Sequence, residues 1–195
     1  YSVLKKEMIE YLHKRTLEMF KEVVSIFDSN NIRYMVCGGT LLGGMTTGKY
    51  IPWDDDLDVC VFEEDYDKAI ESLINGLKDG MEVQCSKTDP NYYIGWIKVR
   101  DKYSIIYPNE PKFKENGVWI DIYKLVKLKE KDAGYTGAKE HIDYLNRRLA
   151  VGALTAEEYE LRLEKNKLKE VLEYEKKKSL QSNSNKEVYM IWSAS

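Results

Sequence analysis

Four aspartates, Asp54, Asp55, Asp56 and Asp58, lie within five residues of the chain, directly before an apolar run. In a partly desolvated cleft they would repel one another, so either several are protonated or divalent cations bind among them. Residues i and i+2 of a strand share a face, so Asp56 and Asp58 can direct both carboxylates to one point. Such hard oxygen ligands suit Mg²⁺ or Mn²⁺. The alternative is a solvated acidic turn after Pro52.

A glycine pair and a threonine precede this acidic stretch. Gly38, Gly39 and Thr40 follow a predicted strand over residues 33–37 and open a segment with helix-forming leucines. Glycine lets the backbone approach a ligand closely, and the N–H groups at the start of a helix face an anion such as phosphate. Thr40 is a suitable residue to cap this short helix, and with the two glycines it is assigned to substrate binding. The pattern therefore predicts an anion-binding turn beside a cation site.

Two blocks of the sequence resemble a known family. The segment GTLLGG, followed after six residues by IPWDDDLD, is similar to the signature of the LicD-type phosphocholine transferases. This family belongs to the nucleotidyltransferase superfamily and is related to the fukutin-type transferases. A later block, GVWIDI, is similar to the second conserved block of the family, so the resemblance covers residues 34–122. It implies an α+β fold with a nucleotidyltransferase-like mixed sheet flanked by helices.

The resemblance also implies roles for single residues. Gly38 and Gly39 would cradle phosphate, and Asp56 and Asp58 would bind the metal. Asp121 would be the third carboxylate of the superfamily and a third metal ligand. Because superfamily members use this aspartate to deprotonate the acceptor, the resemblance assigns the base to Asp121 as well.

The reaction implied by the resemblance is an Mg²⁺-dependent transfer of phosphocholine from CDP-choline to a hydroxyl of a cell-surface glycan. Quaternary ammonium groups bind in aromatic cages. Trp53, Trp96, Trp119 and Tyr50 are candidates for the walls of such a cage, with Trp53 assigned to substrate binding. The sequence does not distinguish choline from ethanolamine, glycerol or ribitol as the alcohol that is carried.

The chain departs from the family pattern at two places. Thr46 and Thr47 stand where many members have an Arg-His pair, and residues 124–126 read Lys-Leu-Val in place of Pro-Leu-Asp. Two other functions therefore stay open. One is nucleotidyl transfer from ATP or CTP to a small acceptor, and the other is a non-catalytic binding module with the same fold.

The elements that must position these residues follow from periodicity. Strands are predicted over residues 81–85, 92–100, 103–107 and 118–125 from alternation and β-branched or aromatic content. Within them Trp96, Lys98 and Arg100 share one face, where the two cations either contact donor phosphates or face solvent. Asp121 points away from its apolar neighbours, so it is either exposed or joined to the metal cluster.

Helices are predicted to flank these strands. Residues 2–28 and 63–77 have apolar side chains at helical spacing, and His13 within the first is expected at the surface. After residue 127 the composition becomes highly charged, with helices predicted over 129–149 and 155–180. We therefore expect a catalytic core over residues 1–127 and a helical appendage over 128–195.

Composition bounds the class of protein. Thirty basic and thirty-three acidic residues give a net charge of −3, which argues against a general nucleic-acid binder. The three cysteines, Cys37, Cys60 and Cys85, lie apart in apolar runs and favour reduced, buried thiols. With no long apolar run and no signal-peptide pattern, a soluble, cytoplasmic enzyme is expected. Because the sequence starts and stops in mid-pattern, we expect one or both natural ends to lie outside it.

Overall fold

The computed structural model of the chain describes residues 2–106 and 112–192. The helices are α1 (Ser2–Ser29), α2 (Gly38–Thr47), α3 (Glu63–Gly76), α4 (Ala133–Ala150), α5 (Ala156–Lys165) and α6 (Leu168–Gln181), with a 3-10 helix η1 (Glu130–Asp132) before α4. The strands are β1 (Tyr34–Val36), β2 (Asp58–Phe62), β3 (Met81–Gln84), β4 (Ile97–Asp101), β5 (Trp119–Lys129) and β6 (Glu187–Trp192). A mixed sheet flanked by helices confirms the α+β fold class.

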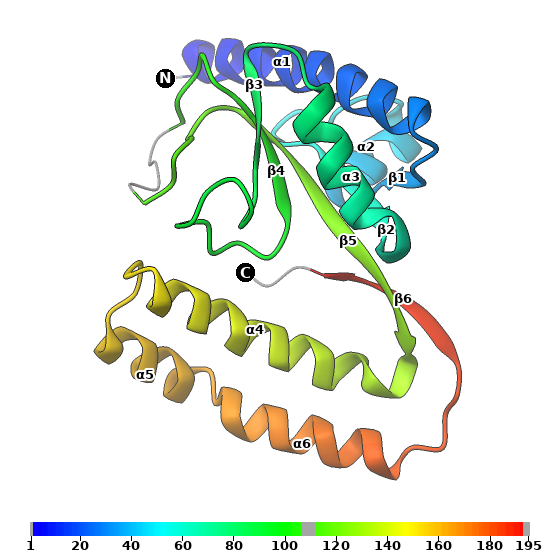
Figure 1. The fold of residues 1–195 in the computed structure, drawn as a ribbon, viewed down its shortest axis with the longest axis vertical. Helices are drawn as coiled ribbons and strands as arrows, with labels where there is room; N and C mark the ends of the chain where they lie inside the picture. The colour runs from blue at the N-terminus through cyan, green and yellow to red at the C-terminus, as the bar shows by residue number, and fades with distance from the viewer. Residues whose placement is uncertain (1, 107–111, 193–195) are drawn as a thin grey trace.

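The sheet has the strand order β1-β2-β5-β4-β3 (Figure 1). Strands β2 and β5 run parallel, whereas the other pairs are antiparallel. Leu125 of β5 pairs with Phe62 of β2 and also with Ile191 of β6, so β6 lies on the side of β5 opposite β2. The long strand β5 is therefore the central element, and both β2 and β4 are aligned on its first half.

The two faces of the sheet have opposite character because side chains alternate along each strand. The face toward α1 and α3 is apolar, and its central side chains are Val59, Val61, Ile97, Val99, Ile120 and Ile122. The other face carries Asp58, Cys60, Lys98, Arg100, Trp119, Asp121 and Tyr123. Burial of the first face supplies the main core, and the second face carries the polar and charged side chains.

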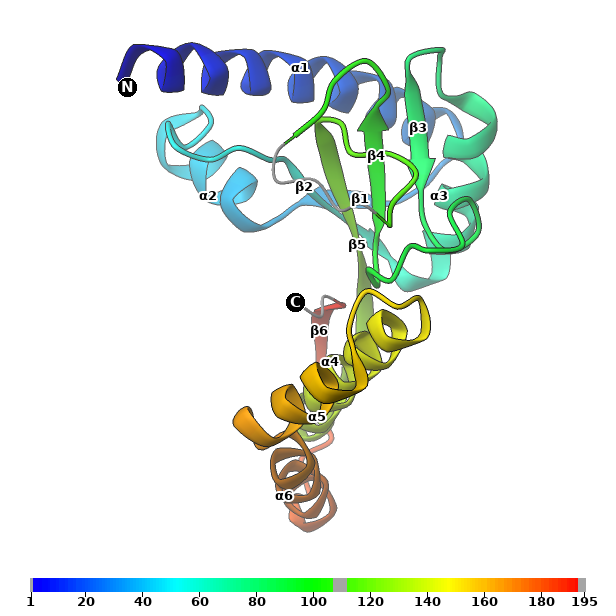
Figure 2. The same cartoon turned by 90° about the vertical axis from the view of Figure 1, so that its left-hand side faces the viewer.

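Helices α1 and α3 cover the apolar face (Figure 2). Helix α1 buries Leu12, Met19, Val23 and Phe27, which recur at helical spacing, as the sequence predicts. Helix α3 begins with acidic residues in its first turn, where they stabilise the positive end of the helix. Among the described residues, none of the helices combines the length and apolar character that crossing a bilayer would require.

Two strand predictions are wrong in part. The strand predicted over residues 92–100 begins only at Ile97, because Tyr92 and Tyr93 pack their rings on Phe113 and form a loop cluster of their own. The strand predicted over 103–107 is a turn and coil as far as residue 106, with the Tyr103 N–H donating to Asp101 Oδ1 at 3.4 Å. Residue 107 lies outside the described residues. Tyr92, Tyr93 and Phe113 thus pack on one another in loops, whereas Tyr103 is exposed.

The C-terminal region also differs from the prediction. The single helix predicted over residues 155–180 is divided into α5 and α6, because Lys167 between them has a left-handed φ of 50°. Thr155 and Glu158 form a capping box at the start of α5. Strand β6 was not predicted. Figures 1 and 2 place α4, α5 and α6 together at the end of the molecule away from α1, and β6 returns the chain to the sheet.

Candidate active site

Asp58 and Asp121 are neighbours across the parallel pair of strands. The first residue of β2, Asp58, is the register partner of Asp121 in β5, and the Asp121 N–H donates to Leu57 O at 3.0 Å. Asp56 lies two residues before Asp58, on the loop that enters β2. Carboxylate oxygens of Asp56, Asp58 and Asp121 all lie within 4.8 Å of one another. The structure thus brings together the three aspartates that the sequence singled out, and their roles as ligands remain predictions.

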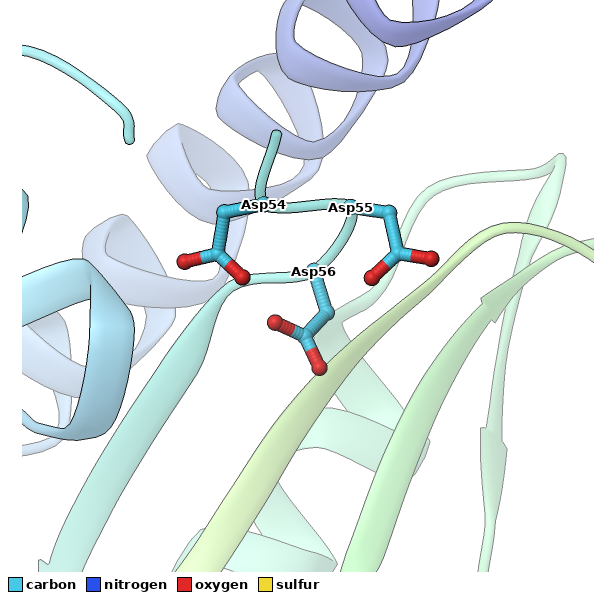
Figure 3. A group of neighbouring side chains, drawn as sticks. All are labelled: Asp54, Asp55 and Asp56. Atoms are coloured by element: carbon cyan, nitrogen blue, oxygen red, sulfur yellow. The ribbon is translucent and has the colours of Figure 1, made fainter. Parts of the chain in front are cut away.

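Asp54 and Asp55 form a second acidic group with Asp56. Figure 3 shows the three side chains spreading from the loop before β2, with Asp56 between the other two. One oxygen of each lies within 4.8 Å of the others. Asp55 is exposed, whereas Asp54 and Asp56 are half-buried. Because both groups contain Asp56, the loop offers oxygen ligands on two sides of this residue.

The charges in the first group are crowded. Burial, together with the charges of Asp58 and Asp121, raises the pKa of Asp56 to about 7. Burial and the charge of Asp121 raise the pKa of Asp58 to about 6, although Tyr123 and Lys98 act in the opposite direction. Without a cation, therefore, the ionised carboxylates of this group cost free energy near neutral pH.

Two carboxylate oxygens in the loop and β2 lack a hydrogen-bond partner. Asp54 Oδ2 and Asp58 Oδ1 are both buried and unbonded within the described part of the chain. Burying a carboxylate oxygen without a partner is costly unless a cation compensates it. Hard anionic oxygens are the ligands that Mg²⁺ and Mn²⁺ prefer. The residues present therefore fit a divalent cation.

The glycine pair makes room for these carboxylates. A Cβ atom on Gly38 would lie 2.3 Å from Asp58 Oδ2, and one on Gly39 would lie 2.2 Å from Asp54 Oδ2. Gly38 also has a left-handed φ of 54°, which disfavours other residues. As the sequence predicted, another group lies close to the backbone of the two glycines. In the structure that group is an aspartate side chain at each glycine. Contact with a donor phosphate remains a prediction for both glycines.

Thr40 has another role than the predicted cap. Helix α2 begins at Gly38, and its N-cap is Cys37, which makes no side-chain cap hydrogen bond. Thr40 therefore lies inside the first turn, and its Oγ1 accepts a hydrogen bond from the Asp58 N–H at 2.9 Å. This bond ties the start of α2 to the start of β2 and helps to fix the position of Asp58.

Asp121 accepts hydrogen bonds from three side chains. Its Oδ1 is 2.5 Å from Lys98 Nζ and 2.5 Å from Trp96 Nε1. Its Oδ2 accepts from Trp119 Nε1 at 2.8 Å. The Lys98 ammonium also lies 4.5 Å from the centroid of the Trp119 ring. These donors offset part of the cost of burying Asp121, which is only 3 % exposed.

Lys98 and Arg100 lie on one strand face but contact different groups. Lys98 joins the acidic cluster through Asp121, so contact between its ammonium and a donor phosphate stays a prediction that the geometry permits. Arg100 is buried behind the Trp119 ring, and its guanidinium donates to Gln84 Oε1 at 2.9 Å and to Gly117 O at 2.8 Å. The structure does not bring Arg100 to the cluster, and its described contacts connect strands and a loop.

The candidate cage aromatics lie in two different places. Trp96 and Trp119 donate hydrogen bonds to Asp121, and both indole rings lie next to the Lys98 ammonium. The cation beside these two rings is therefore a side chain of the protein. Trp53 is 79 % exposed, and together with Tyr50 it lines a surface groove of about 630 Å³ beside the acidic loop. Trp53 and Tyr50 therefore remain the candidates for binding a ligand.

His13 lies against the acidic loop and was not recognised in the sequence. Its ring stacks on Tyr50 at a centroid distance of 4.2 Å, and Nε2 lies 2.6 Å from Asp54 O. His13 is half-buried and lines the surface groove with Tyr50 and Trp53, so the expectation of a surface residue is confirmed only in part. No local signal distinguishes it, because its partners are about forty residues away in the chain. The contact between Trp119 and Asp121 could have been predicted from the sequence, since the two residues lie two positions apart on one strand face.

The chain matches known proteins over the same region. The family model described as LicD/FKTN/FKRP, nucleotidyltransferase domain, matches residues 31–148. An uncharacterized protein of Rickettsia prowazekii (strain Madrid E) is 29% identical over 142 residues, which are 67% of this chain and 52% of that protein. The chain spans about half the length of the curated relatives it matches.

Two relatives have names that state an activity. The lipopolysaccharide cholinephosphotransferase LicD of Haemophilus influenzae is 26% identical over 93 residues, which cover 47% of this chain and 34% of that protein. The ribitol 5-phosphate transferase FKRP of Homo sapiens is 40% identical over 48 residues, which cover 25% of this chain and 10% of that protein.

Proposed function

Because the chain belongs to the LicD/FKTN/FKRP nucleotidyltransferase family, we propose that it transfers a phospho-alcohol group from a nucleotide-linked donor to a hydroxyl group of a glycan. The observation that carries this proposal is the convergence of Asp56, Asp58 and Asp121 on one point. The unbonded oxygen of Asp58 supports it further, because a cation would compensate that charge.

In this proposal Asp56, Asp58 and Asp121 hold Mg²⁺ or Mn²⁺, which would neutralise the pyrophosphate charge of the donor. Asp56 belongs to both acidic groups. This arrangement supports the proposal that a second cation could bind beside the first. Lys98 is assigned to a donor phosphate. An ammonium has three N–H donors and Asp121 takes one, so Lys98 keeps donors for such a contact.

The most specific form of the proposal is phosphocholine transfer from CDP-choline. The groove beside Trp53 and Tyr50 supports this choice, since an exposed indole binds a quaternary ammonium group by cation–π attraction. A relative named for choline and another named for ribitol both match the chain, so the alcohol is a matter for direct assay.

The test follows product release by the purified protein with Mg²⁺, with water as the acceptor of the transferred group when no glycan is supplied. CDP-choline, CDP-ribitol and CTP are supplied separately, and CMP and pyrophosphate are measured. We expect CMP from CDP-choline, and Asp58→Asn lowers this release about a hundredfold or more, because the site loses several kcal/mol of charge stabilisation. The matched control is Asp143→Asn on α4, which removes a half-buried carboxylate that pairs with Lys139. Unchanged turnover in Asp58→Asn would overturn the proposed mechanism.

The same assay separates the two competing functions. Pyrophosphate release from CTP together with loss of CTP would indicate nucleotidyl transfer to an acceptor. Calorimetry with Mg²⁺ and CDP addresses the non-catalytic module. If no metal-dependent nucleotide binding is found, the transferase proposal fails and a binding module with this fold is favoured.

A further inference from the structure

We infer that Trp96 and Trp119 are positioning residues, whose indole N–H groups fix the carboxylate of Asp121 as a cation ligand. The inference rests on the proposed function, because it assumes a cation at Asp121. It also changes one assignment. The resemblance makes Asp121 the base that deprotonates the acceptor, whereas three hydrogen bonds and a bound cation together would leave its carboxylate no lone pair for that proton.

The hydrogen bonds reach Asp121 from both sides of its carboxylate. Trp96 precedes β4 and donates to Oδ1, and Trp119 lies on the same strand as Asp121 and donates to Oδ2. With Lys98 also on Oδ1, three donors use three of about four lone-pair positions of the group. One position is left, and a cation between Asp56, Asp58 and Asp121 would take it.

The two indoles cannot turn freely. The Trp96 ring lies 5.0 Å from the Tyr123 ring, measured between centroids. The Trp119 ring has the Lys98 ammonium at 4.5 Å and the Arg100 guanidinium at 5.0 Å. An indole N–H only donates, so neither ring can adapt to a protonated carboxyl group by accepting from it. The packing of the rings therefore determines the plane of the Asp121 carboxylate.

A fixed carboxylate favours cation binding because its side chain loses its conformational freedom during folding and not when the cation binds. Asp58 differs in this respect, since its Oδ1 has no partner within the described residues and its orientation is set less tightly. Arg100, for which the sequence left open a contact with donor phosphates or exposure to solvent, is buried beside the Trp119 ring. Its guanidinium is held by Gln84 and Gly117 and supports the Trp119 ring from behind.

The test replaces each indole by a phenyl ring and measures cation binding without substrate. Trp96→Phe and Trp119→Phe keep an aromatic ring and remove the N–H donor. The matched control is Trp192→Phe, a half-buried tryptophan of β6 outside the cluster. Mn²⁺ affinity is measured by electron paramagnetic resonance of the free ion, and circular dichroism reports folding. We expect the Kd for Mn²⁺ to rise about tenfold in each cluster variant and to stay unchanged in Trp192→Phe.

Wild-type Mn²⁺ affinity in folded Trp96→Phe and Trp119→Phe would overturn the inference, whatever the transferase assay gives. Conversely, an inactive wild type that binds Mn²⁺ with this dependence on the indoles would overturn only the proposed function. If the tryptophan variants do not fold, a measurement on the wild-type protein still tests the inference. On addition of Mg²⁺, the indole N–H signals of Trp96 and Trp119 in ¹H–¹⁵N spectra should shift more than that of Trp192. Equal shifts would contradict a connection between the indoles and the cation.

Discussion

Gly39 shows how closely the carboxylates of this site are packed against the backbone. In Gly39→Ala the new Cβ would lie 2.2 Å from Asp54 Oδ2, so that side chain must move. The end of a short side chain can shift, and we expect a folded protein whose Mn²⁺ affinity and CMP release fall about tenfold. Thermal unfolding and Mn²⁺ titration check this prediction.

Gly44→Ala is the control for that substitution. It lies on the same helix, and among the described residues a Cβ there would meet no atom within 4 Å other than its chain neighbours and the backbone of that helix. It should increase stability by about 0.5–1 kcal/mol, because alanine favours the helix, and leave cation binding unchanged. If Gly39→Ala behaved like Gly44→Ala, the glycine pair would have no part in placing the acidic group.

Arg15 and Asp101 connect α1 to β4. Arg15 Nη2 donates to Asp101 Oδ1 at 2.9 Å. Burial alone would raise the pKa of Asp101, but hydrogen bonds from Arg15 and Ser104 outweigh it, so this pKa is lowered. A lowered pKa means that the ionised group stabilises the fold above the unfolded pKa of about 3.9, and that this contribution is lost as the pH falls further.

Arg15→Met should therefore destabilise the protein at neutral pH. Breaking a fully buried pair costs about 3–5 kcal/mol, and because the Arg15 side chain is 23% exposed we expect about 2 kcal/mol. The difference from wild type should shrink between about pH 5 and pH 2 as Asp101 takes up a proton. Urea unfolding across this range measures it. Lys139→Met, which breaks an exposed pair on α4, should cost under about 0.5 kcal/mol, and an equal loss in both variants would refute the argument.

Elements that bury one face of their own sequence were predictable. Helices α1 and α3 and strands β2 and β5 show their periodicity directly, and the positions of Asp56 and Asp58 follow from it. Strand β6 was missed because its pairing with β5 depends on residues about sixty positions away. The bonds from Trp96 and Lys98 to Asp121 were missed for the same reason, since they connect β5 to a segment more than twenty residues earlier. Register between strands, and not local pattern, determines these contacts.

Two of the clusters of buried apolar side chains lie at different places in the fold. The main cluster lies between the sheet and helices α1 and α3. A smaller one, formed by Leu145, Leu154, Leu163 and Leu168, joins α4, α5 and α6. The division at residue 127 stays a prediction, because β5 continues to Lys129 and pairs there with β6. Whether the helices unfold separately from the sheet depends on how strongly this strand pair couples the two clusters.

Leu145→Ala tests that coupling. It is 1% exposed, so its truncation should cost about 2–5 kcal/mol in the helical cluster. If the helices are a separate cooperative unit, amide hydrogens of α4 and α6 exchange faster in this variant, while those of β2 and β4 keep their protection and Mn²⁺ affinity is unchanged. Leu73→Ala, the same truncation in the main cluster, should instead reduce protection in the sheet. Equal loss of protection in β2 and α4 on Leu145→Ala would mean that β5 and β6 join both clusters into one cooperative unit, and the predicted division would then be wrong.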